Sequence, residues 1–440
     1  MAISQGPTFR EVYRVDLVSP IGERYELHSY ESLSCSEGKQ GEGDLSVSFG
    51  LFANDIDVSD LIGSMGYGWA VAVSNRHLDR LIGSKLMPLW YGPVVQCRTS
   101  YSAYPRVELE CESFIHHLAR RRLASSPMNT VSDYIFAPAG TIISHMGSSA
   151  FSASVSFSPA YPYAGRDDFG PWQVSMGSVA DGDTVSWQEQ SGGNLWDLWY
   201  DAMERGDMAI GLSRPEITEF AYNFYAPYVY RDLSDSVVFS VANGMLKSVT
   251  RTVDYTSIAN VFQARGSGKE GAQVTTWQAN DTSKVKYGIF EDGATNSAND
   301  NSLSVTNEAQ LQVKTLGEPR VTYDLDVVLS DEYALSGPMD TTTGKFGRRD
   351  IIGFEHPLLG NEHGMDVQGG SWNYKTGMPS HGVAVAGTVV GWRLSLDNGM
   401  PNVGLIVGEV PRNWMHELSQ SVGMAGGRSG GGKRSNRGGW

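Results

Sequence analysis

The interpretation of the centre of the chain depends on one stretch, Val237-Val238-Phe239-Ser240-Val241-Ala242-Asn243-Gly244-Met245-Leu246-Lys247-Ser248-Val249-Thr250-Arg251-Thr252-Val253. It consists of two segments rich in β-branched residues, joined by Asn-Gly. A type I′ turn requires positive φ at both central residues, and asparagine followed by glycine adopts that conformation at little cost. The stretch therefore predicts a β-hairpin.

Downstream of this stretch, residues 258–268 predict a strand that runs into a glycine turn, and Lys286-Tyr287-Gly288 follows. A helix is then expected from about Leu303 to Leu316, because apolar residues recur at steps of three and four. Gly317 and Pro319 stand just beyond it, as is typical of a helix end.

Upstream, Asn194 is a suitable N-cap for a helix over residues 195–205, and Gly206 is a suitable stop. The apolar residues of this helix cover a broad surface, which indicates that it is buried on more than one side. Residues 208–212 form the strand near which the helix packs. Together with the opening stretch, these elements predict a central α+β domain over residues 194–318.

Residues 1–123 predict a β domain, with strands at residues 12–18, 45–49 and 69–73. Leu89–Val95 leads into a hairpin whose return arm is Arg106–Glu112. Along that arm apolar residues alternate with glutamates, so one face lies inward and the other faces water. A short helix that ends in Arg120-Arg121-Arg122 closes the unit.

Residues 319–413 predict a second β domain. Residues 321–329 alternate cleanly between apolar and polar side chains, and Asp397-Asn398-Gly399 separates two further strands in a hairpin. Long, even strands of this kind usually close into a barrel or a sandwich.

Two other segments have a different composition. Residues 124–193 are rich in serine, glycine and aromatic residues and are interpreted as irregular connecting structure packed on the core. Residues 414–440 are glycine-rich and too poor in apolar residues to fold alone. They are expected to be a flexible, basic tail, and the alternative is an arm that orders on a partner through the residues Arg428, Lys433, Arg434, Arg437 and Trp440.

The length and net charge of the chain argue against some classes of function. The 440 residues are enough for two to four domains, and the net charge of −15 argues against a general nucleic-acid binder and a membrane-surface protein. The N-terminus lacks the pattern of a signal peptide, and no apolar run reaches the length of a spanning helix, so no membrane insertion is expected.

The three cysteines, Cys35, Cys97 and Cys111, are too few for a disulfide framework. Cys97 and Cys111 can lie near each other across a hairpin, which leaves one bridge open. Buried thiols in a reducing cytoplasm are the favoured interpretation.

No motif establishes catalysis or metal binding, and no cofactor is expected. The acidic and histidine residues of the loop between His356 and His381 are irregularly spaced, without a His-Glu-x-x-His pattern, so weak metal binding there is the minor alternative. Gly266-Ser267-Gly268 lacks the spacing of a nucleophile elbow. Asp181-Gly182-Asp183 and residues 296–301 do not match a calcium loop and are interpreted as turns.

The order of elements in residues 231–329 is Asp-Leu-Ser, strand, Asn-Gly, strand, Ala259-Asn260 with a strand and Gly-Ser-Gly, Lys-Tyr-Gly, helix, proline and a long alternating strand. This order resembles the tail-tip or baseplate hub proteins of long-tailed bacteriophages, in particular the hub-like family of siphophages that infect actinobacteria. The likeness extends over about residues 12–412 and rests on order and spacing.

The resemblance implies a predominantly β, α+β protein in which two small β-barrel-like domains flank the central α+β domain. It further implies a non-enzymatic, structural virion protein, assembled in the host cytoplasm, that forms a homotrimeric ring at the distal end of the tail tube. The implied partners are the distal tail, tail-tube and tape-measure proteins above and fibre or receptor-binding proteins outside. Genomic DNA would pass only transiently through the channel, and the connecting segment and basic tail depart from the family pattern.

Two alternatives remain open on the sequence. One is a tail-associated hydrolase of cell wall or polysaccharide, which would need paired carboxylates or a metal in a cleft. The other is a glycan-binding, β-rich adhesin, indicated by 11 tryptophans and 20 tyrosines. Several of those aromatic residues fall on predicted core faces, which weakens the adhesin alternative.

Overall fold

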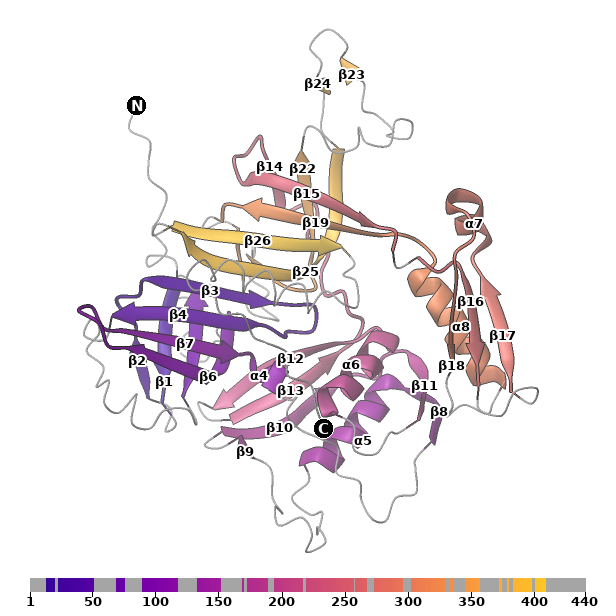
Figure 1. Ribbon diagram of the computed structural model, residues 1–440, viewed down its shortest axis with the longest axis horizontal. Coiled ribbons are helices and arrows are strands. Elements are labelled where there is room, and N and C mark those ends of the chain that lie inside the picture. Colours follow the sequence, from indigo (N-terminus) through magenta and orange to yellow (C-terminus); the bar gives the residue numbers. More distant parts are fainter. Residues whose placement is uncertain are drawn as a thin grey trace, which may run out of the picture.

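The structure is a computed structural model, which describes most of the chain between Tyr13 and Gly408. The described residues are 13–19, 23–50, 69–75, 89–117, 133–151, 168–169, 172–188, 194–216, 219–256, 258–266, 273–295, 302–329, 333–335, 345–356, 372–373, 378–379, 383–397 and 400–408. The predicted fold class, α+β and predominantly β, is confirmed (Figure 1).

A 13-stranded sheet forms the main body. Its N-terminal part contains β2 (Arg24–Glu26), β1 (Tyr13–Val18), β5 (Ala70–Asn75), β6 (Trp90–Ser100), β7 (Arg106–Glu112), β4 (Asp44–Gly50) and β3 (Ser32–Glu37), in that spatial order. The predicted hairpin of β6 and β7 is confirmed, with Ser100 opposite Arg106. Val107, Leu109 and Cys111 are buried as the alternation predicted.

The C-terminal part of the same sheet contains β25 (Val383–Asp397), β26 (Met400–Gly408), β19 (Arg320–Val327) and β15 (Leu246–Asp254), with β22 (Ile351–His356) and β14 (Val238–Ser240) on a branch. The predicted hairpin around Asp397 is confirmed, because β25 pairs with β26 from Val389 to Asp397. Two smaller pairs are β20 (Ala334–Leu335) with β21 (Lys345–Phe346), and β23 (Trp372–Asn373) with β24 (Met378–Pro379).

The two predicted β regions are hydrogen-bonded to each other, because β3 pairs antiparallel with β25. In this register Cys35 lies opposite Leu394 and Glu37 opposite Trp392. One apolar cluster accordingly contains Phe49 and Val71 from the N-terminal part together with Leu325 and Leu405 from the C-terminal part. In the described residues the strand pairings form one open path rather than two closed barrels.

A second unit packs beneath the N-terminal part of the large sheet (Figure 1). It contains β8 (Asp133–Pro138), α5 (Ala139–Phe151), β9 (Asp168–Phe169), β10 (Trp172–Val179), β11 (Thr184–Gln188), α6 (Leu195–Arg205), β12 (Ala209–Glu216) and β13 (Glu219–Tyr225). The predicted helix α6 is confirmed, including Asn194 as its N-cap and Gly206 as its C-cap. Its Trp199 is fully buried and meets the Phe224 ring edge-on.

The interpretation of residues 124–193 as irregular structure is wrong, because the segment contains the 13-residue helix α5 and four strands. Its glycines are the physical reason that the pattern was misread. A Cβ at Gly140 would lie 1.9 Å from the carbonyl oxygen of Ala180, and one at Gly147 would lie 2.5 Å from Met176 Sδ. Glycine lowers helix propensity, but here it permits close packing of the helix.

A third unit projects from the main body at the right of Figure 1. It contains β16 (Val261–Arg265), β17 (Thr275–Ala279), α7 (Asp281–Tyr287), β18 (Glu291–Thr295) and α8 (Ser302–Leu316). The predicted helix α8 is confirmed, and its Val305, Ala309 and Val313 pack with Phe262 of β16 in a separate small cluster.

The hairpin predicted across Asn243-Gly244 is wrong. β14 pairs in parallel with β22, whereas β15 pairs antiparallel with β19. Gly244 does have a positive φ of 74°, but the turn is organised by the Asn243 side chain, which accepts hydrogen bonds from the amides of Ser240 and Met245. The dipeptide predicted the position of a turn correctly, but its type and the strand partners incorrectly, because a type I′ turn needs positive φ at both central residues and only Gly244 of the two has it.

The short helix α4 (Phe114–His117) occupies the predicted place after β7, and the basic cluster at 120–122 lies outside the described residues. None of the helices in the described part of the chain is long and apolar enough to cross a membrane.

Candidate functional site

A group of buried and partly buried polar residues, most of them charged, lies where the large sheet meets the second unit, and we call it the junction. Its residues are Glu37, Lys39, Gln40, Glu42, Glu204, Tyr228, Arg231, Arg348, Arg349 and Asp350. They come from the end of β3 and the turn after it, the end of α6, the segment after β13 and the loop between β21 and β22. Buried charges are normally paired, so each of these groups needs a partner.

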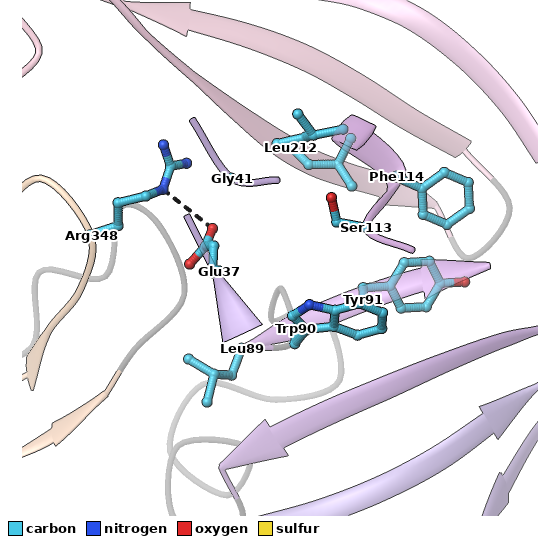
Figure 2. Close-up of a pocket in the computed structure, with 10 residues that line it drawn as sticks. Glu37, Gly41, Leu89, Trp90, Tyr91, Ser113, Phe114, Leu212 and Arg348 are labelled. Atoms are coloured by element: carbon cyan, nitrogen blue, oxygen red, sulfur yellow. Dashed lines mark ion pairs between the residues drawn. The ribbon is translucent and has the colours of Figure 1, made fainter. Parts of the chain in front are cut away.

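Arg348 is the centre of the junction, and 2% of its side chain is exposed. Its Nη1 donates to the carbonyl oxygen of Lys39 at 2.6 Å and its Nη2 to that of Ile210 at 2.7 Å. Nε lies 3.3 Å from Glu37 Oε1, close enough for an ion pair although its N–H does not point at that oxygen (Figure 2). One guanidinium therefore ties three segments together.

Glu37 connects this arginine to the strand that joins the two halves of the large sheet. Its Oε2 accepts a hydrogen bond of 2.6 Å from Nε1 of Trp392 on β25. The neighbouring Trp90 donates through Nε1 to the carbonyl oxygen of Ser36 at 3.0 Å. The Glu37–Trp392 bond thus reinforces the pairing of β3 with β25, and the Trp90 bond links β3 to β6.

Arg349 holds the segment after β13. It has a positive φ of 81°, and it donates to the carbonyl oxygens of Tyr228 at 2.6 Å and Pro227 at 2.9 Å. Its guanidinium carbon lies 5.0 Å from the centre of the Tyr225 ring. Burial, with Arg348 adjacent, lowers the pKa of Arg349 to about 10, so the side chain stays cationic at neutral pH.

Asp350 pairs with Arg231 through both carboxylate oxygens, at 3.0 and 2.7 Å. Its Oδ2 also accepts from the amide of Gly347 at 2.9 Å. Such two-point pairing fixes orientation as well as charge.

Burial raises the pKa of Glu42 to about 7, against the influence of Arg348 and of backbone amides. Its Oε2 accepts from the amide of Gln40 at 2.8 Å. Gln40 in turn donates to the carbonyl oxygen of Met208 and accepts from the amide of Ile210. The Gln40 side chain therefore links the turn after β3 to the start of β12.

The cavity beside Arg348 is small. It has a volume of about 40 Å³ and is lined by apolar side chains of β6, α4 and β12, with Glu37 and Arg348 at one side (Figure 2). A space of this size accommodates one or two water molecules and not a substrate.

A larger cavity of about 280 Å³ lies between the end of α6 and the strands β25 and β26. Its charged residues are Lys39, Glu204 and Asp207, and Lys39 Nζ lies 2.9 Å from Glu204 Oε2. Glu204 Oε1 also accepts from Gln40 at 3.3 Å. Glu204 is therefore already engaged, and the cavity presents no free pair of carboxylates.

Only some of the site residues predicted from the sequence lie within the described part of the chain. His356 lies at the end of β22, whereas the other acidic and histidine residues of the segment to His381 lie outside the described residues, as do Arg428, Lys433, Arg434, Arg437 and Trp440. Within the described ranges no three His, Cys, Asp or Glu side chains are grouped as metal ligands. Asp181 and Asp183 form a turn whose carbonyl oxygens accept from Gly140 and Ala139.

The cysteines are free thiols, as favoured from the sequence. Cys35 and Cys111 are buried and Cys97 is partly buried. Burial raises the thiol pKa of all three, which favours the protonated thiol over the nucleophilic thiolate.

The junction itself was missed from the sequence. Arg348-Arg349-Asp350 reads as a solvent-exposed charged loop, and nothing in its spacing indicates burial. One feature of the sequence could have indicated their burial, namely that the charged residues directly precede the apolar strand Ile351–His356.

Comparisons with known proteins establish the fold. No protein-family profile and no curated protein sequence matches the chain. Among solved structures, the 43 kDa tail protein of prophage MuSo2 from Shewanella oneidensis is similar at a TM-score of 0.53 and 10% identity, over 90% of this chain and 98% of that one.

Two further tail proteins are similar over almost their whole lengths. The prophage tail protein gp18 from Listeria monocytogenes EGD-e has a TM-score of 0.50 and 9% identity, over 94% of this chain and 100% of that one. The tail protein from Neisseria meningitidis MC58 has a TM-score of 0.51 and 10% identity, over 90% and 97%. The chain has the fold of these phage tail proteins.

Proposed function

We propose that this protein is a structural component of a bacteriophage tail, namely a hub of the tail tip or baseplate. The observation that carries the proposal is the likeness to three tail proteins, which spans at least 90% of this chain and at least 97% of each of those chains. A likeness over whole chains supports a shared architectural role more strongly than a likeness of one domain, although fold alone does not determine function.

The junction supports a mechanical role. Buried ion pairs and hydrogen bonds connect the two halves of the large sheet with the second unit, through Arg348, Arg349 and Asp350. Such a network resists relative motion of the units, because a shift of one unit against another breaks several charge-assisted hydrogen bonds at once. A rigid body of this kind suits a protein that transmits force or forms a ring.

In the proposed assembly three copies surround the tail axis below the last ring of the tail tube. The proposed neighbours are the distal tail, tail-tube and tape-measure proteins above and fibre or receptor-binding proteins outside, and the proposed location is the virion. The acidic chain, with a net charge of −15, suits a channel through which DNA slides without binding. The specific likeness to hubs of actinobacterial siphophages is part of this proposal.

Two sequence-based expectations belong to the same proposal. The domain boundaries at residues 123, 193, 318 and 413 remain a hypothesis for limited proteolysis, although the boundary at 193 divides the second unit, in which Ile142 and Trp199 share one apolar cluster. The basic residues Arg428, Lys433, Arg434 and Arg437, with Trp440, are proposed to dock on a tail partner. Deleting residues 414–440 is expected to leave folding intact and to weaken binding to that partner.

A non-enzymatic role is part of the proposal. Within the described ranges, the cavity lined by Glu204 and Asp207 is where the hydrolase alternative can be tested, since a glycosidase needs two carboxylates flanking the bond. If Glu204→Gln abolished a wall- or polysaccharide-degrading activity of the purified protein, the hydrolase alternative would replace the structural proposal.

The test of the structural proposal is light scattering behind size exclusion, with negative-stain images of the same peak. The expected result is a particle of three times 47.9 kDa, about 144 kDa, with threefold symmetry. A particle of one chain at every concentration, with no ring in the images, would contradict the trimer.

A further inference from the structure

The cavity of about 280 Å³ lies beside the end of the last described strand. Gly408, the final residue of β26, belongs to its wall, together with residues from the end of α6, the turn after β3, the segment after β13 and β25. Its volume is just below the range of about 300–1,000 Å³ that is typical of small-molecule sites. A cavity of this size suits one long side chain.

The walls of the cavity are largely apolar. Met203, Met208 and Val390 are buried and line it, whereas Val229 at its edge is 37% exposed. Burying such surface against an alkyl chain is favourable, and methionine side chains adapt their shape to the group that packs on them. The walls therefore suit a ligand with an apolar stem.

One charged group at the cavity has no partner. Lys39 pairs with Glu204 at 2.9 Å. Asp207 is exposed, and among the described residues its carboxylate makes no ion pair or hydrogen bond. The junction next to the cavity contains four basic and four acidic residues, so Asp207 gives the combined site a formal net charge of −1. A free carboxylate above apolar walls suits a side chain with an alkyl stem and a cationic head, such as arginine.

The chain itself supplies an arginine within reach of the cavity. Gly408 is followed by Glu409-Val410-Pro411-Arg412-Asn413, which lies outside the described residues. Four residues span at most about 14 Å, so Arg412 remains close to the wall residue Gly408. A tether this short gives an effective concentration in the millimolar range. Pro411 has a fixed φ, which reduces the conformational entropy lost on docking.

The distribution of charge along the chain favours the same occupant. Residues 409–440 contain five arginine and lysine and two glutamate residues, a net charge of +3, whereas residues 1–408 contain 29 basic and 47 acidic residues, a net charge of −18. An acidic body attracts a basic segment. Within residues 409–413 the charges of Glu409 and Arg412 cancel, so the docking depends on the position of Arg412 relative to Asp207.

We propose that residues 409–413 dock in this cavity of their own chain, with the Arg412 guanidinium paired to the Asp207 carboxylate. The docked segment connects β26 to the end of α6, and so adds a contact between the large sheet and the second unit. It also fixes the point from which the basic residues 428–437 leave the body. The inference goes beyond the proposed tail function and does not rest on the trimer.

Disulfide trapping in the full-length chain tests the docking. Thr388→Cys places a thiol in the cavity wall, and Asn413→Cys places one next to Arg412. A Cys97→Ser background leaves only buried native cysteines. Under mild oxidation with glutathione disulfide, Thr388→Cys/Asn413→Cys is expected to close a disulfide within one chain.

The matched control is Thr252→Cys/Asn413→Cys. Thr252 is exposed and lies opposite Thr322, which lies opposite Gly408, so it is two strands, or about 10 Å, from the end of β26. It does not line the cavity. The control is expected to form its disulfide at least about tenfold more slowly, because docking raises the effective concentration only at the cavity.

Two further substitutions identify the ion pair. Asp207 has a positive φ of 50°, which asparagine also tolerates, so Asp207→Asn removes the charge and keeps the backbone. Asp207→Asn or Arg412→Gln is expected to slow trapping at Thr388→Cys to the rate of the control. Equal rates at the two threonine positions, or a rate at Thr388→Cys that both substitutions leave unchanged, would overturn the docking. A disulfide that joins two chains would assign the cavity to a second copy and would overturn it as well.

Two deletions provide a readout without engineered thiols. Removing residues 409–440 is expected to lower the midpoint of thermal unfolding by about 2–4 °C. Removing residues 414–440 retains Arg412 and is expected to leave the midpoint unchanged. Equal midpoints for wild type and both deletions would contradict the docking and leave the cavity to a side chain of another protein. A wild-type chain that stays single in light scattering would contradict the trimer and leave this docking intact.

Discussion

Arg348 in the junction and Asn260 in the projecting unit perform the same task over different distances. Each is a buried polar side chain that satisfies backbone groups of several segments. Arg348 binds segments 138 and 309 residues away, whereas Asn260 binds segments 23 to 30 residues away. The first therefore organises the whole body and the second organises one unit.

The comparison also separates a charged centre from a neutral one. A buried charge that loses its partners is far more costly than a buried amide that does so. The junction is accordingly expected to contribute much of the free energy of unfolding, and this contribution is expected to depend on pH and on substitution of its residues. The projecting unit, which has a core of six buried apolar residues of its own, is expected to open independently.

The largest expected effect is that of Arg348→Met. The substitution leaves Glu37 without its ion pair and two carbonyl oxygens without donors, so the free energy of unfolding is expected to fall by about 3–5 kcal/mol. Denaturant unfolding measures this loss. The control is Arg393→Met, because Arg393 pairs with Asp324 at the surface and its loss is expected to cost less than about 1 kcal/mol. Equal losses in the two variants would show that the junction is not the centre of stability.

Glu42→Gln tests the pH sensitivity of the junction. The folded pKa of Glu42 is raised from 4.5 to about 7, so between these values the folded chain binds more protons at this site than the unfolded chain does. The contribution of Glu42 to stability is present below pH 4.5 and is lost as pH rises through 7. At pH 8 the glutamine variant is expected to be more stable than wild type by about 3 kcal/mol, and at pH 4 equal to it.

Denaturant unfolding of both proteins at the two pH values isolates this group, because all other titrations are shared. A stability difference that does not change with pH would contradict the raised pKa.

Asn260→Ala is expected to weaken the projecting unit alone. It removes the donor to Gly288 and the acceptor for Phe290, at a cost of about 2 kcal/mol for the exposed unit. Hydrogen exchange is expected to accelerate in residues 258–317 and to stay unchanged in β3 and β25. Faster exchange throughout the molecule would show that the unit does not open independently.

The smallest effects are expected at the helix caps. Asn194 accepts from the amide of Trp196 at the start of α6, and Asn280 accepts from that of Ser283 at the start of α7. Replacing either by alanine is expected to cost about 1 kcal/mol. The loss at Asn194 is expected to lower the midpoint of global thermal unfolding, and the loss at Asn280 to appear only in local hydrogen exchange.

Local signals predicted local structure well. The cap and stop residues Asn194 and Gly206 located α6, and the alternation over residues 106–112 located β7 with the correct buried face. These patterns work because capping and alternation act between residues that are close along the chain. The fold class followed from the same patterns.

Sequence patterns predicted the structure incorrectly where residues distant along the chain determine which elements pair or pack. Asn243-Gly244 makes a turn, but the strands on either side pair with β22 and β19 rather than with each other. The helix α5 is rich in glycine and serine, and it is stabilised by burial of Ile142, Ile143 and Met146 against α6 and neighbouring elements rather than by propensity.

The sequence by itself determined the β-rich class, the helices α6 and α8, two hairpins and the burial of the thiols, because each depends on periodicity, caps or composition. Only the tertiary structure decided that β3 pairs with β25 and that Arg348-Arg349-Asp350 is buried. The physical reason is that these features depend on contacts between residues hundreds of positions apart. The free energy of such contacts exceeds local conformational preferences, and the contacts produce no periodic pattern in the sequence.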